Sequence, residues 1–64
     1  MMNPKYIVLY NPHSDEWLLF DYVEGREKYA PNYGTPVSNG PTPRDAIDMA
    51  VDMFGINPDE VECY

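Results

Sequence analysis

Two runs of apolar and aromatic residues near the start of the chain predict a β-hairpin. The first run, residues 5–10, reads Lys-Tyr-Ile-Val-Leu-Tyr and stops at Asn11 and Pro12, two residue types that commonly end strands. The second run, residues 17–23, is again rich in aromatic and aliphatic side chains. The polar segment 11–16 between the runs has an ordinary length for a hairpin connection.

The second strand is expected to be apolar on both faces. Alternation along a strand sends successive side chains to opposite sides of the sheet. One face then carries Leu18, Phe20 and Tyr22, and the other carries Trp17, Leu19, Asp21 and Val23. One of these faces must pack against a helix. The other needs cover from a long loop, a second subunit or a binding partner.

Residues 43–54 show the pattern of an amphipathic helix. Thr42 is suited to cap its N-terminus, Pro43 to occupy its first position, and Asp45 to return a hydrogen bond to the cap residue. Gly55 is suited to the left-handed conformation that ends helices. The buried stripe is predicted to contain Ala46, Ile47, Ala50, Val51 and Phe54, with Met49 and Met53 at its margin.

The remaining segments are a long loop and a short final strand. Residues 25–41 are rich in glycine and proline and are predicted to form a loop. A loop of this length in a small domain is often functional or disordered. Its apolar residues Tyr29, Tyr33 and Val37 either fold back on the hairpin or remain free for a partner. Residues 60–64 alternate between polar and apolar side chains, which predicts a terminal strand.

These elements predict a single α+β domain, residues 1–64, with the order β-β-α-β. We expect a three-stranded antiparallel sheet with one helix packed on a face. The crossover rule places the last strand beside the first, which gives the spatial order 2-1-3. Layouts of this kind serve many unrelated proteins, so the fold by itself does not indicate a function.

The charge balance narrows the class of partner. Eleven acidic residues against four basic ones give a formal net charge of −7. Direct binding to nucleic acid is not expected, because it depends on clustered Lys and Arg residues that release counterions from phosphates. A net negative charge instead favours approach to basic surfaces, such as those of proteins that hold DNA or RNA. The alternative is that the acidity serves only solubility.

Three aspartates form the most organised chemical pattern in the chain. Asp45, Asp48 and Asp52 are spaced by three and four residues, so they share one stripe of the helix, with neighbours roughly 5–6 Å apart. Further acids at 15, 16 and 59 would extend this charge to the ends of the sheet. The predicted partner-binding residues are Asp45, Asp48, Asp52, Glu60, Glu62, Tyr29, Tyr33 and Trp17.

No catalytic, cofactor or metal site is predicted. His13 is the only histidine, and it falls in the hairpin turn beside Ser14, without the positioned base that nucleophilic catalysis requires. Cys63 is the only cysteine and is expected to be a small core residue that forms no disulfide. One histidine and one cysteine cannot complete a zinc site, and the acids at 59, 60 and 62 lack the spacing of a calcium-binding loop. The chain is therefore not expected to be an enzyme.

The predicted compartment is the cytoplasm, with no membrane attachment. A single cysteine is compatible with a reducing compartment. The apolar run that follows residues 1–5 is too short for a signal sequence or a membrane span.

The arrangement resembles the small antitoxin domains of the HicB type. In those domains a hairpin precedes a helix that opens with Thr, two residues, an acid and Ala, matched here by Thr42, Asp45 and Ala46. The resemblance covers the hairpin and the helix and implies a dimeric antitoxin or regulatory domain. In size and acidity the chain also resembles the small inhibitors that phages make against host defence, transcription or repair proteins.

The sequence therefore supports two hypotheses about function. The leading hypothesis is a phage-type, anti-defence inhibitor that binds a basic, nucleic-acid-handling host protein, with the acidic surface acting as a DNA mimic. The alternative is the HicB-like module, which would form a homodimer through an exposed face or edge of the sheet.

Overall fold

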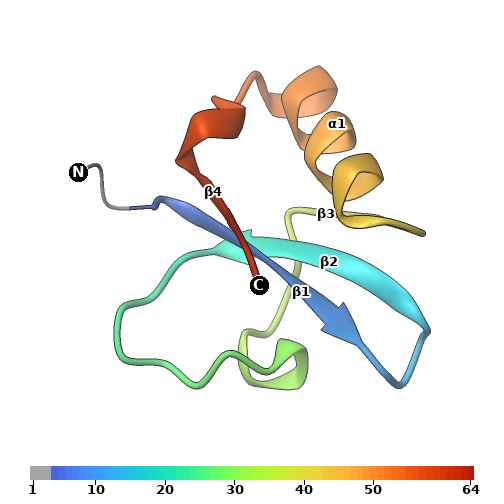
Figure 1. Cartoon of the computed structure of the whole chain (residues 1–64), viewed down its shortest axis with the longest axis vertical. Helices are drawn as coiled ribbons and strands as arrows, with labels where there is room; N and C mark the ends of the chain where they lie inside the picture. Colours follow the sequence, from blue (N-terminus) through green and yellow to red (C-terminus); the bar gives the residue numbers. More distant parts are fainter. Residues whose placement is uncertain (1–3) are drawn as a thin grey trace.

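The computed structural model describes residues 4–64, and residues 1–3, at the start of the N-terminal segment discussed above, lie outside it. Its elements are β1 (Tyr6–Asn11), β2 (Glu16–Asp21), the 3-10 turn η1 (Ala30–Asn32), β3 (Ser38–Gly40), α1 (Pro43–Phe54), the 3-10 turn η2 (Pro58–Glu60) and β4 (Val61–Cys63). The strands form one sheet in the order β3-β2-β1-β4, with α1 across one face and the loop that carries η1 on the other (Figure 1). The predicted α+β class is confirmed.

The predicted hairpin is present, with small differences in its bounds. β1 and β2 are antiparallel from the pair Tyr6 and Asp21 to the pair Asn11 and Glu16, so residues 12–15 form the turn. Within this turn Asp15 has a φ of 54°, a left-handed conformation that Asp adopts more readily than most residues. The pairing of Asn11 with Glu16 places these two residues, predicted to lie in the turn, in the strands.

The predicted three-stranded antiparallel sheet is wrong in its number of strands. β3 lies at the end of the predicted loop and pairs antiparallel with β2 from Trp17 to Leu19. The backbone N–H of Val37 donates to the carbonyl of Leu19 at 2.7 Å. The buried Ser38 hydroxyl donates to the carbonyl of Ala46 in α1 at 2.6 Å. A strand of three residues is too short to show a periodic pattern in the sequence. Its conformation is determined by its contacts with β2 and α1.

The predicted direction of the last strand is also wrong, although its predicted position beside β1 is confirmed. β4 is parallel to β1, with Tyr6 opposite Val61 and Val8 opposite Cys63. The prediction assumed that β2 is the last strand before the helix, so that the helix would return the chain antiparallel to β1. In the structure β3 precedes the helix. β3 is antiparallel to β2 and therefore parallel to β1. The crossing helix returns the chain in the direction of β3, as βαβ connections do.

α1 has the predicted start and end. Thr42 accepts a hydrogen bond from the backbone N–H of Asp45, and Gly55 ends the helix with a φ of 66°. Ala46 and Ala50 are fully buried against Val8 and Leu19 of the sheet. Phe54 was expected in this buried stripe but is 58% exposed. Side chains that follow the helix, Ile56 and Val61, pack against this cluster instead.

The opposite face of the sheet is covered by the loop, one of the three alternatives that the sequence left open. Ile7, Leu9, Leu18 and Phe20 pack there with Ala30 and Tyr33, so η1 and its flanking residues close a second small core. Tyr29 stays 41% exposed, and Val37 packs on the helix side. A second subunit is therefore not needed to bury this face.

Candidate functional site

The aspartates of α1 lie on its exposed side. Asp45, Asp48 and Asp52 are all exposed, whereas Ala46 and Ala50 face the sheet. Because α-helical residues advance by about 100° each, the acidic stripe lies opposite the buried one. The predicted helical display of carboxylates is thus available to a partner.

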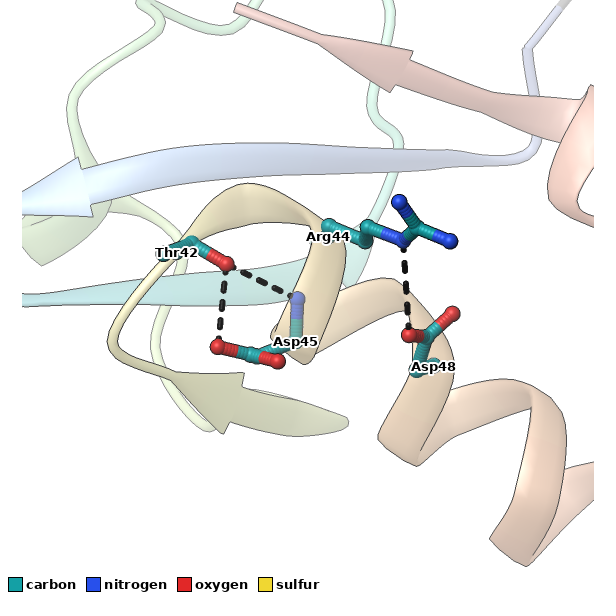
Figure 2. Close-up of polar contacts among 4 residues, drawn as sticks. All are labelled: Thr42, Arg44, Asp45 and Asp48. Carbon is teal, nitrogen blue, oxygen red and sulfur yellow. Dashed lines mark hydrogen bonds and ion pairs between the residues drawn. The ribbon is translucent and has the colours of Figure 1, made fainter.

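Asp45 is the most constrained of the three aspartates. Its carboxylate accepts a hydrogen bond from the Thr42 hydroxyl at 3.0 Å, and its backbone N–H donates to the same hydroxyl oxygen at 3.2 Å (Figure 2). Negative charge is favoured at this end of a helix because the first N–H groups point toward it. Asp45 therefore contributes to the helix start as well as to the exposed stripe of aspartates.

Asp48 and Asp52 differ in their pairing. Arg44 Nε lies 3.8 Å from Asp48 Oδ2, one turn along the helix (Figure 2). Both side chains are largely exposed, 90% and 67%, so this ion pair is weak. Asp52 has no ion-pair partner among residues 4–64.

Two acids near the end of the chain, Glu60 at the end of η2 and Glu62 in β4, form ion pairs within the fold. Lys5 Nζ lies 3.0 Å from Glu60 Oε2, and Lys28 Nζ lies 3.4 Å from Glu62 Oε1. The hydrogen bond and the charge of Glu60 raise the pKa of Lys5. Glu60 and Glu62 therefore form a separate, internally paired region beside β4 rather than an extension of the helical stripe.

The predicted aromatic residues do not gather into one surface. Tyr33 is only 8% exposed and belongs to the core on the loop side, so its ring is not offered to a partner. Trp17 is half-buried, with its ring tilted against Tyr10 at a centroid distance of 5.4 Å. Tyr29 is exposed, and its hydroxyl lies 3.4 Å from His13 Nε2.

A cleft near the start of α1 brings two further acids next to the helix. It has a volume of about 390 Å³ and is lined by the hairpin turn (residues 14–16), the corner before the helix (residues 39–41) and Met49. Asp15 and Glu16 are its acidic residues. The sequence placed them at an end of the sheet, and only the packing of β3 brings that end beside the helix.

Gly40 allows this corner to close on the helix. A Cβ atom at Gly40 would lie 2.6 Å from Asp45 Cβ and 2.7 Å from the Ala46 nitrogen. These distances are shorter than van der Waals contact, so any larger residue at this position would clash with the helix. Asp45 thus lies directly against the lining of the cleft. Met49 is one turn from Asp45, and Asp52 is nearly one turn farther.

All four basic side chains are engaged within residues 4–64, and only Arg44 contacts an aspartate of α1. Lys5, Lys28 and Arg44 form the three ion pairs described above, and the Arg26 guanidinium lies 5.3 Å from the centre of the Tyr33 ring. Eleven acids less three paired ones leave eight that form no ion pair within the described residues 4–64. Four of these, Asp15, Glu16, Asp45 and Asp52, lie at or beside the cleft and the exposed side of α1.

Hydrogen bonds hold the two carboxylates of the cleft. Asp15 Oδ1 accepts a hydrogen bond from the Tyr10 hydroxyl, and this contact raises the pKa of Tyr10 because it favours the protonated phenol. Glu16 Oε2 accepts a hydrogen bond from Asn39 Nδ2 at 3.4 Å. We refer to Asp15, Glu16, Asp45, Asp48 and Asp52 together as the acidic surface.

The described residues contain no arrangement typical of metal binding. In the part of the chain from 4 to 64, no three His, Cys, Asp or Glu side chains gather closely enough to hold an ion. Cys63 is exposed, contrary to the expectation of a core residue, and it lies in the short edge strand β4. No helix in this range is long and apolar enough to cross a membrane.

Comparisons with known proteins give no relative. No protein-family profile, no curated protein and no solved structure matches this chain.

Proposed function

We propose that this protein is a small inhibitor or adaptor that binds a basic surface of a nucleic-acid-handling protein, as phage-type inhibitors of host proteins do. The observation that carries the proposal is the distribution of charge. Lys5, Lys28 and Arg26 are engaged with residues outside the acidic surface, and within residues 4–64 the only base that pairs with this surface is Arg44, through its weak contact with Asp48.

The binding mode follows from the position of this surface. α1 presents carboxylates at successive turns, with neighbours roughly 5–6 Å apart on a rigid element. In this proposal the carboxylates take the place of nucleic-acid phosphates on the basic partner, and the charge speeds association. Tyr29, exposed beside His13 at the hairpin turn, adds an aromatic contact near the same end of the molecule.

The test compares charge reversal at two locations. The variant Asp48→Lys/Asp52→Lys is matched by Glu24→Lys/Asp59→Lys, which changes the net charge equally at two exposed positions outside the acidic surface. Each protein is immobilised and exposed at low salt to a nuclease-treated lysate of the native host. A basic partner held by wild type and by the control is expected to be lost from Asp48→Lys/Asp52→Lys, because like-charge contacts at an interface cost on the order of several kcal/mol.

Melting temperatures of the three proteins should be similar, since exposed substitutions usually change the free energy of unfolding by no more than about 0.5 kcal/mol. Capture must also weaken as salt rises, because the interaction is electrostatic. Undiminished capture by Asp48→Lys/Asp52→Lys would refute the role of the helical aspartates.

A second candidate function is the dimeric antitoxin-like or regulatory module. The observation that favours it is the outer edge of β4, which pairs with no other strand of the described sheet. Exposed edges can pair with a strand from another chain. The covered loop-side face argues against an extensive apolar interface, so a dimer of this kind would depend on an edge of the sheet, such as that of β4.

A further inference from the structure

The cleft beside the hairpin turn combines an apolar wall with two carboxylates. Met49, 40% exposed on α1, and Pro41 supply apolar surface, and Asp15 and Glu16 supply negative charge. A volume of about 390 Å³ is near the lower end of the roughly 300–1,000 Å³ typical of ligand sites. A cleft of this size suits one long side chain better than an extended ligand.

Both carboxylates are held in place but retain binding capacity. Tyr10 donates to Asp15 Oδ1, and Asn39 donates to Glu16 Oε2. The other oxygens, Asp15 Oδ2 and Glu16 Oε1, have no hydrogen-bond partner among residues 4–64. Neither residue forms an ion pair in that range. The cleft therefore has two oriented acceptors and an uncompensated negative charge.

We propose that this cleft receives an arginine side chain from a partner protein. The methylene stem of arginine packs on apolar surface such as that of Met49, while its head stays with polar groups. The planar guanidinium carries five N–H donors and can bridge two neighbouring carboxylates. Lysine carries a single ammonium group and lacks the paired N–H donors of the guanidinium. Phosphate groups would be repelled by the two carboxylates. This inference rests on the proposed function in one respect, namely that the arginine belongs to the basic partner protein.

The test uses a capped arginine, Nα-acetyl-arginine amide, titrated into the ¹⁵N-labelled protein. The expected result is a saturable shift of the backbone amides of Asn39, Gly40 and Met49. Capped citrulline, which has nearly the same shape without the charge, is expected to produce no shift. Capped lysine is expected to bind more weakly than arginine.

Isosteric variants locate the interaction. Asp15→Asn/Glu16→Gln retains acceptors for Tyr10 and Asn39 but removes both charges, and Glu24→Gln/Asp59→Asn removes two charges outside the cleft. The first variant is expected to weaken arginine binding about fivefold, the change that corresponds to roughly 1 kcal/mol of lost ion pairing. The control is expected to bind nearly as wild type does. The amide spectrum of each variant verifies its fold in the same experiment.

Two results would overturn this assignment: equal binding of citrulline or lysine, or undiminished arginine binding by Asp15→Asn/Glu16→Gln. Its failure is distinguishable from failure of the proposed function. If the lysate experiment succeeds and the titration fails, the partner binds the helical aspartates without using the cleft. If the titration succeeds and the lysate experiment fails, the cleft binds arginine but the role of the helical aspartates is refuted.

Discussion

At the scale of single residues, Tyr33 was predicted from the sequence to bind a partner but lies in the core of the structure. Its ring packs against Phe20 at a centroid distance of 5.3 Å, and Arg26 lies over its face. Its hydroxyl is buried and has no hydrogen-bond partner among residues 4–64. Such a group loses its hydration on folding and gains nothing in return.

Replacing Tyr33 with Phe should therefore stabilise the protein. The substitution keeps the packed ring and removes the unpaired hydroxyl, so we expect the free energy of unfolding to rise by about 1 kcal/mol. Urea denaturation followed by fluorescence measures the change. Tyr29→Phe is the matched control, because its hydroxyl is on an exposed residue, and it should leave stability nearly unchanged. A loss of stability in Tyr33→Phe would show that the hydroxyl has a partner.

At the scale of elements, α1 depends on its N-terminal cap. Thr42 Oγ1 accepts from the Asp45 N–H and donates to the Asp45 carboxylate, so one side chain both satisfies a free N–H and orients an acid of the acidic surface. Thr42→Ala removes both hydrogen bonds. We expect it to lower the free energy of unfolding by about 1 kcal/mol, the usual cost of losing such a cap.

Thr35→Ala provides the control for this prediction, since Thr35 is exposed in the loop. Thermal unfolding monitored by circular dichroism compares the two variants. A melting temperature for Thr42→Ala no lower than that of Thr35→Ala would mean that the packing of Ala46 and Ala50 on the sheet, rather than the cap, determines where the helix begins.

At the scale of the whole molecule, both faces of the sheet are covered by the chain itself. The helix covers one face and the loop with η1 covers the other, so the monomer covers both apolar faces of its sheet. We expect a single species of 7.4 kDa in sedimentation equilibrium at micromolar concentration. A concentration-dependent species of twice this mass would instead favour pairing through the edge of β4, and with it the antitoxin-like alternative.

The sequence alone determined the local features of this protein. The helix from Pro43 to Phe54 followed from Thr42, Asp45 and Gly55, because caps act on backbone groups only a few residues away. The hairpin followed from two apolar and aromatic runs separated by the polar segment 11–16. The exposed aspartate stripe followed from helical periodicity, since the spacing of three and four residues places its members on one side of any helix.

Only the tertiary structure decided the features that join distant segments. Strand β3, the parallel direction of β4 and the burial of Tyr33 depend on contacts that no short sequence pattern contains. The same holds for the site. Lys5 neutralises Glu60 and Lys28 neutralises Glu62, while the packing of β3 brings the hairpin turn beside Met49. Electrostatic and packing energies depend on distance in space, so residues far apart in sequence determined which acids remain free for a partner.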